Sequence, residues 1–223
     1  MKPEKRERLS CSALLLDMDG VVLDSMPYHV AAWMKALREH GFNVNEEILY
    51  LYEGAIEPEI AVELFSSQGC RMSQEVFHKV LKRQKEIFVS DFRQKVRPFP
   101  EIPDILSMIK KDGRSLALVT SSHGEILDAV LPRELVLLFD RIVAGDQVKK
   151  RKPHPDPYLK AMKALGINGD KDAAAVENAP SGIKSAKNAG LKTIAITTTL
   201  PAERLKGADT VISSHAELLN VFE

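Results

Sequence analysis

Two aspartates follow a short apolar run near the N-terminus and are separated by one residue. They are Asp17 and Asp19, in the stretch LLLDMDGVVLDS at 14–25. Two carboxylates this close repel each other, so a fold that keeps both needs a cation or a shared proton. One could attack phosphorus as a nucleophile while the other acts as acid and then base, and a divalent cation would relieve the repulsion. Taken alone, the pattern fits an acidic turn equally well.

Three later stretches also carry polar side chains that could take part in chemistry. They are Thr120, Ser121 and Ser122 in LVTSS (118–122), Lys152 in RKPHPDPY (151–158), and Glu177 with Asn178 in VENAPSG (176–182). Hydroxyls can donate to a phosphate oxygen, a lysine fixed beside prolines can neutralise the nucleophile, and the last pair offers oxygens to a hard cation. Each stretch alone also has a plain interpretation, as a helix cap, a solvated lysine or a turn.

The elements that would carry these residues alternate between strands and helices. Short apolar runs predict strands at 12–16, 115–120, 141–145, 173–177, 192–197 and 210–213, and helical patterns lie at 101–112, 124–131, 155–166, 180–190 and 215–222. Such alternation predicts an α/β fold, a doubly wound parallel sheet with helices on both faces. Sites in these folds gather at the carboxyl ends of the strands.

A helical segment interrupts this alternation directly after the first strand. Pro27 is placed to start a helix and Gly41 to stop it, and further helices are expected at 45–52, 58–67 and 73–90. We interpret 26–95 as an all-helical cap domain inserted into a core formed by 1–25 and 96–223. The KRQK run at 82–85 is most simply a solvated face of a cap helix, and Trp33 fits the buried face of the first one.

Composition narrows the classes of partner. The 223 residues are 44% apolar, and 31 basic residues balance 31 acidic ones, so no net charge attracts nucleic acid or a membrane surface. The two cysteines, Cys11 and Cys70, do not form a disulfide framework, and the charged N-terminus lacks a secretory apolar segment. We expect a cytoplasmic monomer that binds a small molecule.

The four polar stretches, in this order and each at a strand end, resemble the haloacid dehalogenase superfamily of phosphoryl-transfer enzymes. Within it, the chain is similar to the subgroup that contains β-phosphoglucomutase and sugar-phosphate phosphatases, which carry a helical cap after the first motif. The resemblance implies a Rossmann-like core and an aspartyl-phosphate on the nucleophile Asp17, with Asp19 as acid and base. It implies that Thr120 and Lys152 bind the phosphoryl group, and that Asp17, the Asp19 carbonyl, Glu177 and Asn178 hold Mg²⁺.

One position departs from the family pattern. Relatives usually have an acidic pair where this chain has Glu177 and Asn178, so an amide replaces one metal-binding carboxylate. An amide oxygen still binds Mg²⁺ but carries no charge. We therefore expect magnesium to bind, with lower affinity.

The choice between a phosphatase and a mutase depends on the cap. In β-phosphoglucomutase a cap arginine, three residues after a glycine, holds a second phosphate, whereas Gly54 is followed three positions later by Glu57, which would repel one. The lysine that follows the second motif of the mutase is replaced by His123. YHVAAW (28–33) does resemble the mutase, in which the equivalent of His29 positions the acid/base aspartate. We favour a phosphatase, with a mutase as the alternative.

Residues that would contact the substrate are expected in the cap and beside the second motif. They are His29, Glu57 and Tyr28 from the cap and Ser121 and Ser122 from the core. His29 is equally consistent with a plain surface histidine. A binding module on a decayed enzyme scaffold is the alternative from another class, although retention of the catalytic set argues against it. Sugar phosphates, polyol phosphates, phosphoglycolate and nucleotides all remain open as substrates.

Overall fold

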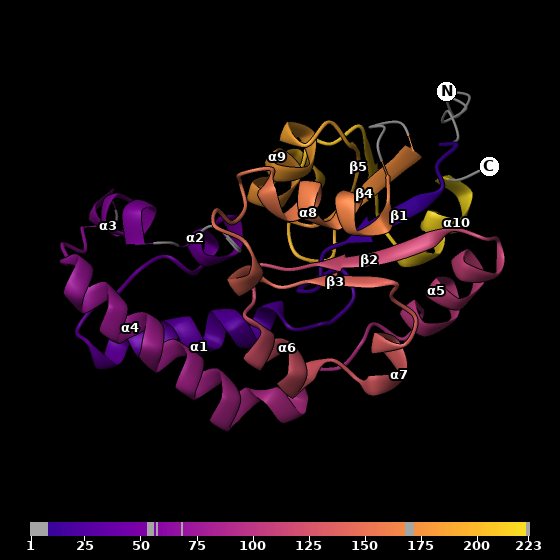
Figure 1. Cartoon of the computed structure of the whole chain (residues 1–223). Helices are drawn as coiled ribbons and strands as arrows, with labels where there is room; N and C mark the ends of the chain where they lie inside the picture. The colour runs from indigo at the N-terminus through magenta and orange to yellow at the C-terminus, as the bar shows by residue number, and fades with distance from the viewer. Residues whose placement is uncertain (1–8, 53–55, 57, 68, 168–171, 222–223) are drawn as a thin grey trace.

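The computed structural model describes residues 9–52, 56, 58–67, 69–167 and 172–221. Its centre is a six-stranded, all-parallel sheet with the strand order β3-β2-β1-β4-β5-β6 (Figure 1). The strands are β1 (Ala13–Leu16), β2 (Ser115–Val119), β3 (Arg141–Val143), β4 (Ala173–Glu177), β5 (Lys192–Ile196) and β6 (Thr210–Ile212). All six predicted strands are confirmed, as is the α/β class.

The unbroken apolar runs arise because the sheet is covered on both faces. Along β1, Leu14 and Leu16 pack into one hydrophobic cluster, while Ala13 and Leu15 pack into a second cluster. Successive side chains of a strand point to opposite faces, so a strand buried on both sides has no polar positions to alternate.

Two layers of helices provide this cover. Helices α8 and α9 lie on one face of the sheet, and α5 and α10 lie on the other (Figure 1). The helices of the core are α5 (Ile102–Lys111), α6 (Gly124–Val130), α7 (Arg133–Val136), α8 (Asp156–Leu165), α9 (Pro180–Asn188) and α10 (Leu218–Val221). The short α7 was not predicted, and the helix expected at 215–222 begins with a 3₁₀ turn at His215–Glu217.

Between β1 and β2 the chain forms the predicted helical insertion, at the left of Figure 1. Its helices are α1 (Met26–Glu39), α2 (Glu46–Leu51), α3 (Pro58–Ser67) and α4 (Gln74–Ile87). Helix α1 has Pro27 in its first turn and ends just before Gly41, whose φ is +80°. The Trp33 ring packs between those of Phe65 and Phe77, so its predicted place in a core is confirmed. The domain limits at 25/26 and 95/96 stay a prediction.

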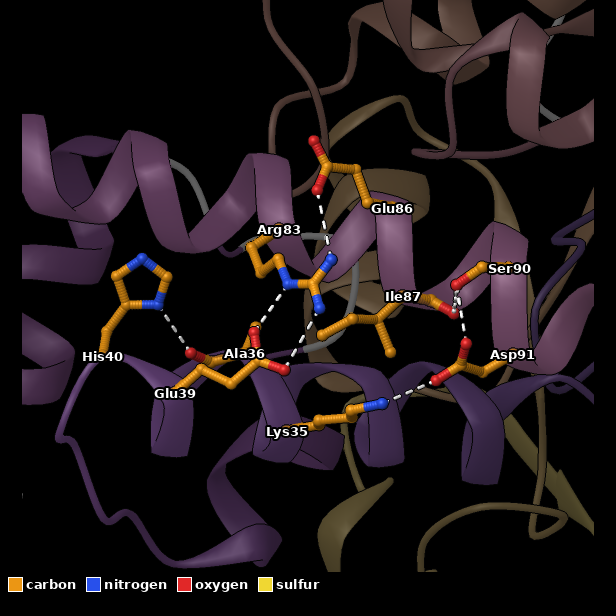
Figure 2. Close-up of polar contacts among 9 residues, drawn as sticks. All are labelled: Lys35, Ala36, Glu39, His40, Arg83, Glu86, Ile87, Ser90 and Asp91. Atoms are coloured by element: carbon orange, nitrogen blue, oxygen red, sulfur yellow. Dashed lines mark hydrogen bonds and ion pairs between the residues drawn. The ribbon is translucent and has the colours of Figure 1, made fainter.

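The last cap helix ends differently from the prediction. Instead of one α-helix over 73–90, α4 continues into a π-helix at Phe88–Phe92. Contacts with α1 hold this wider turn, because the Phe92 ring stacks on Tyr28 and Asp91 Oδ2 accepts a hydrogen bond from Lys35 Nζ at 2.8 Å (Figure 2). Figure 2 also shows Arg83 of α4 bound to Glu39 of α1, so ion pairs connect α1 both to α4 and to the π-helix that follows it.

Two further sequence expectations can be compared with the structure. Cys11 and Cys70 are both free thiols. Within the residues that the structure describes, no helix is both long and apolar enough to cross a bilayer.

Candidate active site

Three of the four polar stretches meet where the central strands end. Leu16, the last residue of β1, is aligned with Leu118 of β2 and with Val176 of β4. Asp17 follows the last residue of β1, Thr120 follows the last residue of β2, and Glu177 ends β4. All three therefore lie at the same edge of the sheet. The Asp17 amide donates to the Val176 carbonyl at 3.0 Å, which fixes the backbone of that aspartate.

Lys152 joins this edge from the segment between β3 and α8. Its Nζ lies 2.5 Å from Asp17 Oδ1 and 2.7 Å from Glu177 Oε1, and it donates to the Val119 carbonyl at 2.9 Å. Only 3% of the residue is exposed. Burial alone would lower the pKa of Lys152, but Asp17 and Glu177 outweigh it and raise the pKa, so the side chain stays an ammonium.

Glu177 is held from a second side by a residue that the sequence analysis missed. The Tyr158 hydroxyl donates to Glu177 Oε1 at 2.5 Å. Burial, together with the nearby Glu177 and Asp17 carboxylates, raises the pKa of Tyr158, so the phenol remains protonated. Its place in the first turn of α8, six residues after Lys152, was the one sequence feature that could have suggested it.

Gly182 of α9 lies against the other side of the same carboxylate. A Cβ at this position would lie 2.1 Å from both Glu177 oxygens. Only a glycine therefore leaves room for Glu177 to reach Lys152.

The buried and charged surroundings of Asp17 perturb its pKa. Burial raises its pKa well above the usual range, Lys152 lowers it, and Glu177 and Asp19 raise it further. Three buried carboxylates thus face one buried ammonium, an excess of negative charge that a cation would relieve.

Asp19 has a full set of hydrogen-bond donors. Its Oδ1 accepts from Ser25 Oγ at 2.6 Å and lies 3.1 Å from His29 Nε2, and its Oδ2 accepts from Ser122 Oγ at 2.9 Å. Burial would raise the pKa of Asp19, but His29, Ser25 and Ser122 together lower it. The side chain is therefore ionised and held in one orientation.

The three hydroxyl residues after β2, Thr120, Ser121 and Ser122, each make different contacts. Thr120 is 1% exposed, and its Oγ1 accepts from the Ser122 amide at 3.0 Å. Ser122 reaches Asp19, and Ser121 lines the space between the carboxylates and the cap. All three predicted hydroxyl residues therefore lie at the site.

The polar groups around Asn178 fit a hard cation. Its Nδ2 donates to Thr199 Oγ1 at 2.8 Å, which turns Oδ1 the other way, and Oδ1 is buried with no hydrogen-bond partner among the described residues. Gly20, with φ +85°, leaves room for the amide, because a Cβ there would lie 2.0 Å from Nδ2. A buried, orphaned carbonyl oxygen beside an excess of carboxylates is a suitable ligand for Mg²⁺.

No cluster of three or more His, Cys, Asp and Glu side chains in metal-binding geometry occurs in the described part of the chain. A cation here would thus depend on carbonyl and amide oxygens as well as carboxylates. Glu177 is already engaged by Lys152 and Tyr158, and its direct ligation of a metal stays a prediction.

Two cavities open beside these residues. A small one of about 10 Å³, enough for one water-sized group, lies among Asp17, Asp19, Lys152, Glu177 and Asn178. A larger one of about 100 Å³ lies between the cap and the core. Ser121 lines both, so the two spaces adjoin at this residue.

The larger cavity has polar walls from both sides. Gln84 of α4 is 5% exposed, lines this cavity, and forms no hydrogen bond with its side chain in the described part of the chain. Across from it, His123 Nε2 is buried and finds no hydrogen-bond partner within the ranges that the structure describes. Burial and the charges of Lys85 and Arg151 lower the pKa of His123, so its ring is neutral near pH 7.

The remaining cap predictions have mixed outcomes. His29 reaches Asp19, whereas Tyr28 stacks on Phe92 and lines neither cavity. Glu57 lies outside the described residues. The interpretation of 82–85 as a solvated face is wrong for Gln84. Helix α4 packs on other cap helices with one face and lines the cavity toward the core with another, so it buries more than one stripe of side chains.

Comparisons with known proteins agree with this geometry. The profile of the family described as haloacid dehalogenase-like hydrolase matches residues 14–196. A Thermotoga maritima protein named phosphorylated carbohydrates phosphatase is 30% identical over 183 residues, 82% of this chain and 83% of the relative. The phosphoglycolate phosphatase of Aquifex aeolicus is 33% identical over 190 residues, 81% of this chain and 82% of the relative.

A solved structure from Bacteroides vulgatus, provisionally assigned as a β-phosphoglucomutase, is also similar. It is 31% identical with a TM-score of 0.78, and the match covers 93% of this chain and 86% of that one. The fold and the helical insertion therefore occur together in this relative.

Proposed function

The chain belongs to the haloacid dehalogenase-like hydrolases, and we propose that it is a Mg²⁺-dependent phosphatase of a small sugar or polyol phosphate. The observation that carries the proposal is the ion pair between Lys152 and Asp17 at the end of β1, completed by Glu177. A carboxylate next to a fixed ammonium can accept a phosphoryl group, because the ammonium offsets the charge of both.

The first half of the reaction forms a bond between Asp17 and phosphorus. The Asp17 carboxylate attacks, the bond between phosphorus and the leaving oxygen breaks, and Asp19 gives that oxygen a proton, so the product leaves as an alcohol. Asp19 is ionised in the arrangement described above and has to take up a proton before this step.

The second half regenerates the enzyme. Asp19, now a carboxylate, removes a proton from water, the water oxygen attacks the phosphorus, and the bond to Asp17 breaks, which releases inorganic phosphate. Lys152 and the Thr120 hydroxyl hold the phosphoryl oxygens in both halves. When bound, Mg²⁺ would supply positive charge at these oxygens, with Asp17, the Asp19 carbonyl and Asn178 as its ligands.

The larger cavity supports the proposed class of leaving group. The free amide of Gln84 can both donate and accept, as can the neutral imidazole of His123, and sugar hydroxyls need partners of this kind. The buried His123 Nε2 has no partner among the described residues, which costs free energy that a hydroxylated ligand would recover.

A phosphomutase is the second candidate, and one observation favours it. Lys85 and Arg151 line the same cavity, so a second phosphate would meet positive charge there. Both cations already make interactions within the chain, and the residue in place of the mutase lysine, His123, is neutral. We therefore favour hydrolysis.

The first experiment measures phosphate release from p-nitrophenyl phosphate with Mg²⁺ and with EDTA. We expect metal-dependent turnover in the native protein and its loss in Asp17→Asn, which keeps the shape but lacks the nucleophilic charge. Full turnover by this variant would exclude covalent catalysis by Asp17. A folded native protein with no turnover of any phosphate ester would favour a binding module.

The second experiment separates hydrolysis from isomerisation. The protein is incubated with β-glucose 1-phosphate and a trace of glucose 1,6-bisphosphate, and the glucose 6-phosphate and inorganic phosphate are measured. We expect phosphate to accumulate faster. Isomerisation that outpaces phosphate release would establish the mutase instead.

A further inference from the structure

The imidazole of His29 lies flat against the ring of Phe88. The ring centroids are 3.9 Å apart and the planes differ by 8°, and Phe88 is 1% exposed. Contact over a whole ring face leaves the imidazole little freedom to tilt or rotate. The plane of His29 is therefore set by Phe88.

That plane determines where the imidazole can donate. His29 Nε2 lies 3.1 Å from Asp19 Oδ1, the oxygen that also accepts from Ser25. A hydrogen bond weakens steeply as the donor leaves the line to its acceptor, so a rotated imidazole would lose Asp19. The carboxylate would then keep one donor fewer and could turn away from the substrate.

Phe88 reaches His29 from the opposite end of the cap sequence. His29 lies in the first turn of α1, whereas Phe88 opens the π-helix that follows α4. The wide turn directs three of its residues at α1, because Asp91 binds Lys35 and Phe92 stacks on Tyr28 while Phe88 stacks on His29 (Figure 2 shows the Lys35–Asp91 pair). Such widened turns are frequent at functional sites.

We infer that Phe88 is a positioning residue, which holds the His29 ring so that His29 orients the Asp19 carboxylate toward the leaving oxygen. The inference rests on the proposed phosphatase function. It assigns to Phe88 no contact with the substrate's phosphorus. Phe88 also lines the larger cavity, so the double-mutant cycle below separates an effect through His29 from a direct contact with the leaving group.

Two substrates with different leaving groups test this role. An alkyl phosphate releases an alkoxide, which needs a proton from Asp19, whereas p-nitrophenyl phosphate releases a stable phenolate that needs little help. The ratio kcat/KM reports the steps up to phosphorylation of Asp17, where the acid acts. In Phe88→Leu we expect kcat/KM for hexitol phosphate to fall about tenfold or more, and that for the aryl ester to fall less than about threefold.

Phe77→Leu is the matched control. Phe77 lies on the same helix as Gln84 and is fully buried, but its ring packs on Trp33 and Phe65, and in the described part of the chain it makes no ring contact with His29. We expect this variant to change kcat/KM for both substrates by the same factor. If Phe88→Leu behaves like it, with equal losses for both esters, Phe88 is only a core residue and the inference fails.

A double-mutant cycle checks the route through His29. In the His29→Gln background, Phe88→Leu should lower kcat/KM for the alkyl ester by less than about twofold more, because the side chain that Phe88 positions is gone. An undiminished effect in that background would overturn the inference. Should Phe88→Leu not fold, as judged by circular dichroism, Phe88→Met is assayed instead, because its unbranched side chain adapts better to the space left by the ring. A native protein that hydrolyses neither ester would contradict the proposed function rather than the role of Phe88.

Discussion

The small cavity around Asp17, here called the phosphoryl site, adjoins the larger cavity between cap and core, here called the leaving-group cavity, at Ser121. The two differ in how far their polar groups are satisfied by hydrogen bonds. Around Asp17, Lys152 and Glu177 the charged atoms bind one another at 2.5 to 2.7 Å. In the cavity beyond, Gln84 and His123 Nε2 have no hydrogen-bond partner in the described part of the chain. Among the described residues of the first site, the only buried side-chain atom without a partner is Asn178 Oδ1, which a cation would satisfy, whereas the second site requires a hydroxylated ligand to complete it.

This difference follows from the elements that carry each site. The phosphoryl site stands on strand ends whose backbone is fixed by the parallel ladder, so its geometry is built into the core. The cavity is shared between α4 of the cap and the loop after β2. Chemistry common to many substrates would thus reside in the rigid part, and selectivity in the part formed by two separate bodies of structure.

The largest expected effect comes from removing the Lys152 ammonium from the phosphoryl site. Lys152→Met would leave Asp17 and Glu177 buried without their cation, and we expect a loss of about 3–5 kcal/mol in the free energy of unfolding, measured in urea. Turnover of any ester should fall by at least about 100-fold. Lys187→Met is the control, because its pair with Asp209 is exposed, and it should cost below about 1 kcal/mol. Similar losses in both variants would contradict the picture of a tightly paired core site.

Metal affinity gives the next largest effect. Asn178→Asp adds a charge where Oδ1 is unpartnered, so the Mg²⁺ dissociation constant should fall about tenfold, measured by calorimetry and by activation of turnover. The Thr199 hydroxyl can donate to the new carboxylate, which keeps the side chain in place. In Asn178→Leu the affinity should weaken instead. Unchanged affinity in both variants would mean that this residue is not a ligand.

A smaller and selective effect is expected in the cavity. Gln84→Met keeps the length of the side chain but removes its hydrogen-bonding atoms, and kcat/KM for hexitol phosphate should fall about tenfold. Hydrolysis of hexyl phosphate, which has no hydroxyls, should not fall. Gln74→Met, exposed at the start of α4, serves as the control. Equal losses for both esters would show that Gln84 acts on folding rather than on selectivity.

The smallest effect belongs to the exposed ion pairs between α1 and α4. Arg83 donates to both Glu39 oxygens, at 2.6 and 3.2 Å, but these side chains remain more than one-third exposed (Figure 2). Arg83→Met should therefore leave the midpoint of urea unfolding and kcat nearly unchanged, because exposed ion pairs contribute little to stability. A large loss of activity would mean that these pairs govern how the cap is seated.

The core was predictable because its signals are local. A strand buried on both faces is an unbroken apolar run, and the residue that ends it, such as Asp17 or Glu177, must lie at the carboxyl edge. Lys152 was placed there by its resemblance to a known motif, and the structure brings it to Asp17.

The cap was less predictable because its signals depend on partners distant in sequence. Gln84 stands in a charged run and is buried only because a core loop faces it. The π-helix likewise depends on contacts with α1, 50 residues or more away in the chain, and Phe88 looks like any core phenylalanine until His29 lies against it. Tyr158 was overlooked for the same reason.

The glycine at 182 shows how a residue without functional groups can control a reaction. An alanine there would push the Glu177 carboxylate aside, and the Lys152 ammonium would lose one of its three contacts. Under the proposed mechanism, a larger residue at position 182 would abolish turnover by displacing the Glu177 carboxylate, although no polar group is removed. In that mechanism, catalysis therefore requires the absence of a methyl group at position 182.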